Sequence, residues 1–463
     1  MIAAPASSSG KTTLTCALLR LLQKRGKSPV SFKCGPDFID PMFHKRVLGV
    51  NSENLDSFFC TEGQVRSIFK RNFLESNANC AVIEGVMGLF DGLAGKSIHA
   101  SSYEIAKITK TPVMLVLDCA GLSRSAVPIV KGFLDYDKGN SGGAENLIKG
   151  VFLNKASKSL FELLKPQIEE ECTVKVVGYL PKKENVWQSR HLGLILPSEI
   201  KTLQEEIEST ANLLSETLDF TALEELMNRA GERCFSCNDG LVQANLDSSL
   251  RGAASAKQSP VIAVARDEAF CFYYRENLRL LEESGAKIKF FSPITDSCLP
   301  SDAAGILLGG GYPELYALRL QENTSMRSSI KSAVKNGISL MAECGGFMYL
   351  QEKIISQNST NELCGVIKGE CRYTGNLVRF GYAEFSSNPL NSSSWGKFSV
   401  KGHEFHYFAR TNNGTSFTAK KPLSRRSWQC MIQDEKMLAG FPHLYYRSCP
   451  ELVEHFVNSC KKG

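Results

Sequence analysis

Apolar and polar positions alternate along the first half of the chain in a way that predicts a parallel sheet. Five short apolar runs are typical of buried strands, at residues 28–34, 80–85, 112–118, 147–154 and 174–180. Amphipathic stretches, such as residues 12–25, separate these runs and indicate helices. Strands that alternate with helices in this order favour a parallel sheet with helices on both faces.

The pattern lapses between residues 219 and 259 and then resumes. This segment holds one amphipathic stretch, followed by a passage rich in Ser, Ala, Asn and Gly that has no apolar period. Such a passage predicts an interdomain linker. Alternation restarts at residues 261–265, and strands and turns predominate after residue 344. We therefore predict a first domain over residues 1–218, a linker over residues 219–259 and a second α/β domain over residues 260–463.

Composition agrees with this division and excludes several classes of protein. At 463 residues, with 43% hydrophobic and 22% charged residues, the chain is too long for one ordinary core. No segment approaches the ~18 uninterrupted apolar residues of a membrane span. The net charge of +6 comes without the Lys/Arg run of a nucleic-acid-binding arm. The N-terminus runs into a polar loop without an export signal, so we expect a cytoplasmic protein with reduced cysteines.

The N-terminal loop carries the first chemical signal. Residues 4–13 read A-P-A-S-S-S-G-K-T-T and lead into the first predicted helix. A loop of small residues that ends in Gly-Lys-Thr presents backbone N–H groups and a helix N-terminus to a polyphosphate. We therefore predict that Gly10, Lys11, Thr12 and Thr13 bind ATP, with the Thr12 hydroxyl reaching Mg2+. Pro5 stands where this motif usually begins with glycine, so the loop alone could also be a Ser-rich helix cap.

Acidic residues follow the predicted strands at the same rim. Asp37 and Asp40 lie in K-C-G-P-D-F-I-D-P, whereas Glu84 and Asp91 lie in E-G-V-M-G-L-F-D-G. The carboxyl ends of strands in an open α/β sheet point into the ligand crevice. Glu84 directly follows an apolar strand, as is typical of a carboxylate that organises Mg2+. Each acid alone could be a cap or a turn residue, but together they favour phosphorylation of a carboxylate substrate.

A cysteine in a glycine-rich turn marks the second domain. Residues 341–350 read M-A-E-C-G-G-F-M-Y-L, so Cys344 ends a predicted strand and precedes a predicted helix. This arrangement is typical of a nucleophile elbow, and we expect the helix N-terminus to lower the pKa of the thiol. Upstream, Gly309, Gly310 and Gly311 can present N–H groups to the oxyanion formed on a glutamine side-chain amide. A lone core cysteine is otherwise most often structural.

The nucleophile needs a base, and the chain has seven histidines. We predict that His443, which ends a late apolar segment, is this base. His403 and His406 alternate along a predicted strand and are the alternatives. Tyr445 stands two residues beyond His443, so no acid is available there and no third member of the Cys–His pair is predicted.

Taken in order, these blocks resemble the cobyrinic acid a,c-diamide synthase family. Further blocks that carry the resemblance are R-H-L-G-L at residues 190–194, A-R-D-E-A-F-C-F-Y-Y at residues 265–274 and G-H-E-F-H-Y at residues 402–407. The resemblance covers the chain except for the linker. It implies a dethiobiotin-synthetase-like P-loop domain fused to a class I glutamine amidotransferase domain of flavodoxin-like fold. Ser8 and Phe38 depart from the glycine and tyrosine often found in that family.

The resemblance also implies a reaction. ATP would convert the a and c acetate carboxylates of cobyrinic acid into acyl phosphates, and ammonia released from glutamine would displace the phosphate, in cobalamin biosynthesis. Carried over from the family, Asp37 and Asp40 would act at the substrate, and Asp40, Glu84 and Asp91 would bind Mg2+ together with Thr12.

Three alternatives stay open on the sequence. Hydrogenobyrinic acid or nickel-sirohydrochlorin could replace cobyrinic acid as the substrate of the same chemistry. A cobyric acid synthase would amidate other side chains with a related pair of domains. A nucleotide switch with an inert amidotransferase-like appendage is a different class of protein. The sequence carries no signal for the oligomeric state.

Overall fold

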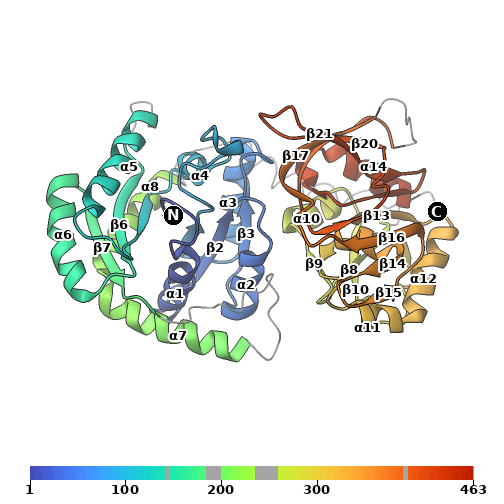
Figure 1. The fold of residues 1–463 in the computed structure, drawn as a ribbon, viewed down its shortest axis with the longest axis horizontal. Coiled ribbons are helices and arrows are strands. Elements are labelled where there is room, and N and C mark those ends of the chain that lie inside the picture. The colour runs from blue at the N-terminus through green and yellow to red at the C-terminus, as the bar shows by residue number, and fades with distance from the viewer. Residues whose placement is uncertain (142–144, 184–199, 235–258, 389–394, 462–463) are drawn as a thin grey trace. The chain divides into compact units, whose positions relative to one another are not determined.

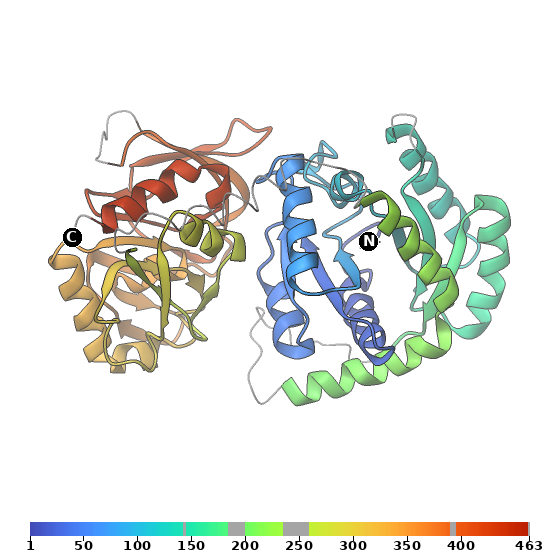
Figure 2. The same ribbon diagram turned by 180° about the vertical axis from the view of Figure 1, so that it is seen from behind.

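The computed structural model describes residues 1–141, 145–183, 200–234, 259–388 and 395–461. The chain divides into two units, Met1–Gly240 and Leu241–Gly463, and Figures 1 and 2 show their elements from opposite sides. The predicted α/β class is confirmed. The sequence block at residues 190–194 lies outside the described residues.

A seven-stranded sheet forms the centre of the first unit, with the strand order β3-β2-β4-β1-β5-β6-β7. All neighbouring strands in it are parallel. The five apolar runs predicted as strands correspond to β2, β4, β5, β6 and β7, so these predictions are confirmed. The strands are β1 Ile2–Ala3, β2 Pro29–Cys34, β3 Ser52–Leu55, β4 Cys80–Glu84, β5 Val113–Asp118, β6 Ile148–Asn154 and β7 Lys175–Leu180.

Helices cover both faces of this sheet, as predicted (Figure 1). Helices α1, α2, α7 and α8 pack on one face, and α3 to α6 pack on the other. Their apolar stripes and the β-strands bury a core between these layers. The helices are α1 Lys11–Lys24, α2 Ile39–Leu48, α3 Glu62–Glu75, α4 Ser102–Thr109, α5 Ala126–Asn140, α6 Lys158–Cys172, α7 Ile200–Thr217 and α8 Phe220–Cys234.

The second unit is built on a six-stranded sheet with the order β10-β8-β11-β13-β23-β22. Its strands are parallel except for β22, which runs antiparallel to β23 at the edge. The restart of alternation at residue 261 coincides with β8, which confirms that prediction. The strands are β8 Val261–Ala265, β10 Lys287–Phe291, β11 Ala303–Leu308, β13 Ser339–Glu343, β22 Ile432–Gln433 and β23 Met437–Gly440.

Three smaller sheets elaborate this unit, and the two larger of them follow residue 344, where the sequence pattern predicts strands and turns. Their strands are β9 Phe270–Phe272, β12 Gly310–Gly311, β14 Gln351–Ile355, β15 Thr360–Glu362, β16 Ile367–Tyr373, β17 Arg379–Ser387, β18 Ser399–His406, β19 Phe408–Ala409, β20 Phe417–Lys420, β21 Ser427–Cys430 and β24 His443–Leu444. The helices are α10 Arg275–Glu283, α11 Ala317–Glu322, α12 Thr324–Lys335, α13 Gly345–Tyr349 and α14 Pro450–Cys460.

The segment predicted as a linker begins with helix α8. Ala222 and Leu223 of this helix are buried in the core of the first unit. The remainder of the segment, residues 235–258, lies outside the described residues. The boundaries of the two domains and of the linker therefore stay a prediction.

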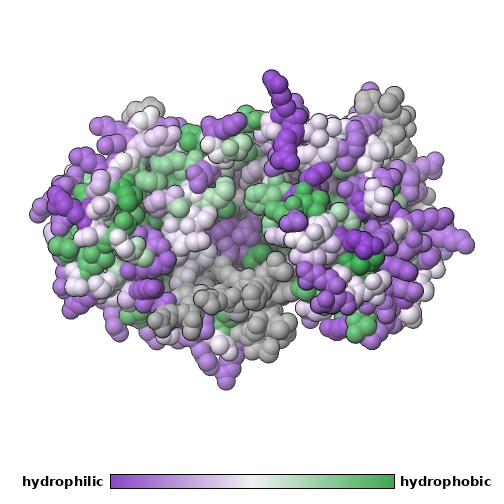
Figure 3. Space-filling model, viewed as in Figure 1, coloured by the Kyte–Doolittle hydropathy of each residue, from purple (hydrophilic) through white to green (hydrophobic). Residues whose placement is uncertain are grey.

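Hydrophilic residues predominate on the face seen in Figure 3, and hydrophobic residues form separate patches there. Across the described ranges, none of the helices combines the length and the apolar character that a membrane crossing requires. The chemistry of interest lies at the carboxyl ends of the parallel strands, in two sites described next.

Candidate functional sites

The N-terminal loop turns into helix α1 through residues in the left-handed region of backbone space. Gly10 has a φ of 90° and Ser8 has a φ of 62°. A Cβ atom at Gly10 would lie 2.1 Å from Nδ2 of Asn154. The same Asn154 amide donates a hydrogen bond to the Ser9 carbonyl at 2.9 Å. Glycine is therefore required at position 10 by its φ and by the close approach of Asn154, which the sequence did not single out.

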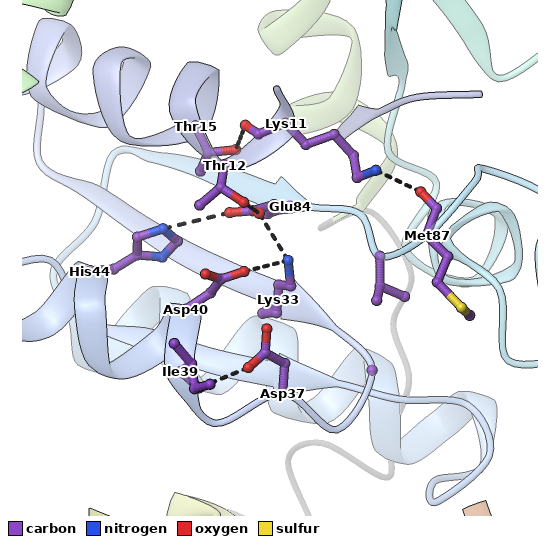
Figure 4. Close-up of polar contacts among 12 residues, drawn as sticks. Lys11, Thr12, Thr15, Lys33, Asp37, Ile39, Asp40, His44, Glu84 and Met87 are labelled. Atoms are coloured by element: carbon purple, nitrogen blue, oxygen red, sulfur yellow. Dashed lines mark hydrogen bonds and ion pairs between the residues drawn. The ribbon is translucent and has the colours of Figure 1, made fainter. Parts of the chain in front are cut away.

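The side chain of Lys11 folds back across this loop, as Figure 4 shows. Its ammonium donates to the carbonyl of Ala6 at 2.9 Å and to the carbonyl of Met87 at 2.6 Å. Burial, followed by the neighbouring charge of Lys33, lowers the pKa of Lys11 to about 8. A lysine held in this position can exchange the two carbonyls for the oxygens of a polyphosphate.

Lys33 joins the carboxylates of the first site (Figure 4). Its Nζ lies 2.6 Å from Asp40 Oδ2 and 2.8 Å from Glu84 Oε1, and all three side chains are buried. Burial alone would lower the pKa of Lys33, but the charges of Glu84 and Asp40 outweigh burial and raise it. Thr12 Oγ1 donates to the same oxygen of Glu84 at 2.5 Å. The sequence marked the block around Lys33 without assigning this residue a role.

Of the other two predicted acids, Asp37 lies beside this cluster and Asp91 lies beside the phosphate loop. Asp37 accepts a backbone N–H at 2.8 Å, and burial, followed by the charge of Asp40, raises the pKa of Asp37 to about 7. Asp91 is exposed, and its Oδ2 accepts the N–H of Gly88 at 2.8 Å. A Cβ atom at Gly88 would lie 2.6 Å from the carbonyl oxygen of Pro5, so the turn that carries Asp91 packs against the phosphate loop.

His44 of helix α2 is a second residue that the sequence did not single out. Its Nε2 lies 3.6 Å from Glu84 Oε2, and its Nδ1 lies 3.0 Å from Ser31 Oγ. Glu84 Oε2 is buried and accepts no hydrogen bond from the described part of the chain. With the Thr12 hydroxyl beside it, Glu84 offers the hard oxygen donors that Mg2+ prefers.

In the second unit, Cys344 occupies a strained turn between β13 and α13. It has φ 45° and ψ −103°, and its N–H donates to the Gly440 carbonyl at 2.8 Å. A Cβ atom at Gly346 would lie 2.2 Å from the Leu308 carbonyl oxygen, so the turn requires glycine there. This geometry is that of a nucleophile elbow.

The expected lowering of the Cys344 pKa is wrong for this structure. Burial raises the pKa of the thiol, and the charge of Glu314 raises it further, ahead of that of Glu404. The helix that begins here, α13, spans only five residues, so its N-terminus has little dipole to oppose burial. Burial therefore favours the neutral thiol at the predicted nucleophile.

The three predicted oxyanion glycines lie next to the elbow. The N–H of Gly309 is engaged, because it donates to the Tyr273 hydroxyl at 2.7 Å. A Cβ atom at Gly345 would lie 3.0 Å from the backbone nitrogen of Gly311. A Cβ atom at Gly310 would lie 2.3 Å from Cε1 of His443. Strand β12 therefore lies between the elbow and the predicted base and contacts both.

The histidines of this site lie on two paired strands. His443 of β24 stands opposite His403 of β18, and their rings stack at 4.9 Å with an interplanar angle of 16°. Tyr274 Oη lies 3.1 Å from Nδ1 of His403, and His406 Nδ1 lies 2.7 Å from the Phe408 carbonyl. Burial lowers the pKa of His403 to about 3. Burial, followed by the charges of His403 and His406, lowers the pKa of His443.

Comparisons with known proteins match both units. Residues 1–195 match the CobQ/CobB/MinD/ParA nucleotide binding domain, and residues 261–448 match the CobB/CobQ-like glutamine amidotransferase domain. The cobyrinate a,c-diamide synthase of Priestia megaterium is 36% identical over 467 residues, which cover 100% of this chain and 96% of that protein.

Two further relatives carry the same name. The protein of Listeria innocua serovar 6a is 37% identical over 100% of this chain and 99% of its own length. That of Caldanaerobacter subterraneus subsp. tengcongensis is 37% identical over 99% of this chain and 98% of its own length. The resemblance drawn from the sequence blocks is confirmed, and the chain belongs to the cobyrinate a,c-diamide synthase family.

Proposed function

We propose that this enzyme uses ATP and glutamine to convert the a and c acetate carboxylates of cobyrinic acid into amides, by way of acyl phosphates, in cobalamin biosynthesis in the cytoplasm. The observation that carries the proposal is that one chain holds both a phosphate loop, crosslinked by the hydrogen bonds of Lys11, and a cysteine in a nucleophile elbow. A phosphate loop alone is compatible with a nucleotide switch, and an elbow alone with a simple amidase. Their combination fits a synthetase that makes its own ammonia.

The first site supports the activation of a carboxylate. The loop amides and Lys11 would bind the phosphates of ATP. Lys11 Nζ already donates to the carbonyl of Ala6 in the loop and to that of Met87, which follows β4. The substrate carboxylate would attack the γ-phosphorus, and ADP would leave. Lys33 holds Asp40 and Glu84 in place within 2.8 Å and keeps two buried carboxylates from repelling each other. Asp37 and Asp40 stand at the same rim to orient the substrate.

Thr12 and Glu84 would hold Mg2+, which supplies charge neutralisation at the phosphates. The fit rests on the buried Oε2 of Glu84 and on the Thr12 hydroxyl, 2.5 Å from Oε1 of the same carboxylate. In the described ranges, no group of three or more His, Cys, Asp or Glu side chains is arranged to hold a metal. Mg2+ at nucleotide sites is ordinarily held by few protein oxygens and by phosphates. We assign Asp40 and Asp91 to the outer part of this site.

The second site supports the release of ammonia from glutamine. Burial keeps the imidazole of His443 neutral at pH 7, so it can accept the proton of the Cys344 thiol as the sulfur attacks the side-chain amide. The N–H groups of Gly310 and Gly311, which lie close to His443 and to the elbow, would bind the oxyanion, whereas the N–H of Gly309 donates to Tyr273. Return of the proton to the leaving nitrogen frees ammonia, and water then releases glutamate from the thioester.

The substrate is tested by turnover with three macrocycles. Purified enzyme with ATP, Mg2+ and glutamine is supplied with cobyrinic acid, hydrogenobyrinic acid or nickel-sirohydrochlorin, and amide products are counted by mass spectrometry. We expect two amides per cobyrinic acid and the highest kcat/KM for that substrate. Amidation of nickel-sirohydrochlorin alone, or of hydrogenobyrinic acid alone, would replace cobyrinic acid in the proposal.

A further inference from the structure

We propose that helix α10 positions the base of the glutaminase site, with Asn277 as the positioning residue. The inference rests on the proposed role of His443. It addresses the question that the sequence left open, namely what holds this histidine in place when no acid stands two residues beyond it. The block at residues 265–274 leads directly into this helix.

Both ends of the Asn277 side chain bind the backbone directly after His443. Its Nδ2 donates to the carbonyl of Leu444 at 2.7 Å, and its Oδ1 accepts the N–H of Tyr446 at 2.8 Å. Asn277 is 5% exposed, so water does not compete for these bonds. Because the amide nitrogen donates to a carbonyl and the amide oxygen accepts an N–H, the side chain fixes both the position and the direction of this segment.

Helix α10 also forms ion pairs with Arg447, the next residue of the same segment. Arg447 Nε lies 2.5 Å from Glu276 Oε2, and Arg447 Nη2 lies 2.9 Å from Glu283 Oε1. Asn277 and these two acids come from one helix of nine residues. The helix therefore binds the chain at three positions within four residues of His443.

Glu343 connects the same segment to the nucleophile. It directly precedes Cys344, and its buried carboxyl group lies beside the Tyr446 hydroxyl and the Leu444 N–H, which offset part of the rise in its pKa. The neighbour of the predicted nucleophile thus lies against the neighbour of the predicted base. The backbone segments that carry Cys344 and His443 are therefore both held in place. For this reason the site does not need the side-chain acid of a conventional triad to set the distance between sulfur and imidazole.

This support is needed because β24 is short. It spans only His443 and Leu444, and its pairing with β18 joins two residues on each strand. Gly310 approaches the His443 ring closely, so a small shift of β24 would bring the imidazole against β12. A misplacement of about 1 Å can cost about 100-fold in rate.

The test compares Asn277→Leu with a matched variant, Asn323→Leu. Asn323 likewise uses both ends of its side chain, because Nδ2 donates to the carbonyls of Pro293 at 2.9 Å and Asp296 at 2.8 Å and Oδ1 accepts the N–H of Met326 at 3.2 Å, in the same unit but on another segment. For Asn277→Leu we expect kcat for glutamine hydrolysis to fall about 100-fold, with KM for glutamine changed less than about threefold. Asn323→Leu should change kcat less than about threefold.

A double variant separates positioning from a general effect on the fold. If Asn277 acts through the base, Asn277→Leu combined with His443→Gln should be no slower than His443→Gln alone. An equal further loss in the double variant, a rise in KM without a fall in kcat, or an equal loss in Asn323→Leu would overturn the inference. If His443→Gln keeps the full rate, the proposed base fails instead. Should Asn277→Leu lose cooperative unfolding, Asn277→Asp, which keeps the acceptor for Tyr446, replaces it with the same expectations.

Discussion

The two sites of this chain are held together by opposite kinds of interaction. In the phosphate-loop site, buried charges bind one another, with Lys33 within 2.8 Å of both Asp40 and Glu84. In the cysteine site, burial favours the uncharged form of both predicted reacting groups, because it raises the pKa of Cys344 and lowers that of His443. Glycine backbone and a stacked histidine ring set the geometry there.

The difference follows from what each site must meet. A polyphosphate arrives with several negative charges, so a site of pre-paired charges can exchange partners when it binds. A glutamine side-chain amide is neutral, and a neutral thiol next to a neutral imidazole needs close approach instead. Removing one member of the buried ion pairs should therefore lower the stability of the first site. Replacing a glycine beside the predicted base with alanine should instead lower the activity of the second.

The first expected effect is on the activity of the cysteine site. In Gly310→Ala the new Cβ would lie 2.3 Å from Cε1 of His443, so the imidazole must move. We expect glutamine hydrolysis to fall about 100-fold, with ammonia-driven synthesis unchanged. Gly63→Ala, where a Cβ meets nothing within 4 Å, is the control and should leave both rates unchanged. Normal hydrolysis by Gly310→Ala would mean that this contact does not position the base.

The next effect is on the stability of the first unit. Lys33→Met leaves two buried carboxylates without their cation, and breaking a buried pair in this way costs about 3–5 kcal/mol. Urea unfolding followed by circular dichroism measures the loss. The control is Lys27→Met, which breaks an exposed ion pair of 3.3 Å with Glu224 and should cost less than about 1 kcal/mol. Equal losses in the two variants would contradict the pairing of charges in the first site.

The pH dependence of the free energy of unfolding gives a further test of the cysteine site. Burial raises the pKa of Glu343 to about 8 from a usual value of 4.5. Between these values the folded chain holds a proton that the unfolded chain has released, so the free energy of unfolding falls as pH rises, by at most about 1.4 kcal/mol per pH unit.

Glu343→Gln removes this proton while keeping an acceptor oxygen. From pH 5.5 to 7.5 the variant should lose less unfolding free energy than the unmodified chain. The measurement is the difference between the two proteins, because Asp37 and Glu314 also have raised pKa values, each about 7. Parallel curves for the two proteins would show that Glu343 is ionised throughout this range.

The smallest effect concerns backbone strain at Ser8. Both sites place a non-glycine residue at positive φ, Ser8 at 62° and Cys344 at 45°. We expect the loop to bind ATP through the backbone of Ser8 and not through its side chain. Ser8→Gly should therefore relieve the strain of the positive φ, raise the free energy of unfolding by about 1 kcal/mol and leave the KM for ATP unchanged. A loss of stability or of ATP affinity would show that the hydroxyl of Ser8 has a role of its own.

The sequence predicts the parts of the fold that depend on local pattern. Runs such as residues 112–118 are apolar because both faces of β5 are buried, and this shows directly in the letters. Strand β1 has only two residues, and β3 reads S-E-N-L at an edge of the sheet, so neither has a pattern to detect. Motif spacing located Gly10, Lys11 and Cys344 for the same local reason.

Contacts between distant segments could not be predicted in this way. Lys33 meets Glu84 only because β2 and β4 are neighbours, and the sheet order is not written in any one segment. The sequence offers His403 as an alternative base, and its stacking on His443 follows from the pairing of β18 with β24. The pKa of Cys344 depended on the burial of its turn, which the motif does not report.

The most direct test of the account compares two nitrogen donors in one variant. Cys344→Ser is assayed for ATP-dependent amide formation from cobyrinic acid, first with glutamine and then with ammonium salts at pH 8. The account predicts that glutamine-driven synthesis is lost while ammonia-driven synthesis stays within about twofold of the unmodified enzyme. Loss of both reactions would contradict it, because Cys344 would then support the fold or the first site. Retention of glutamine-driven synthesis would exclude Cys344 as the nucleophile.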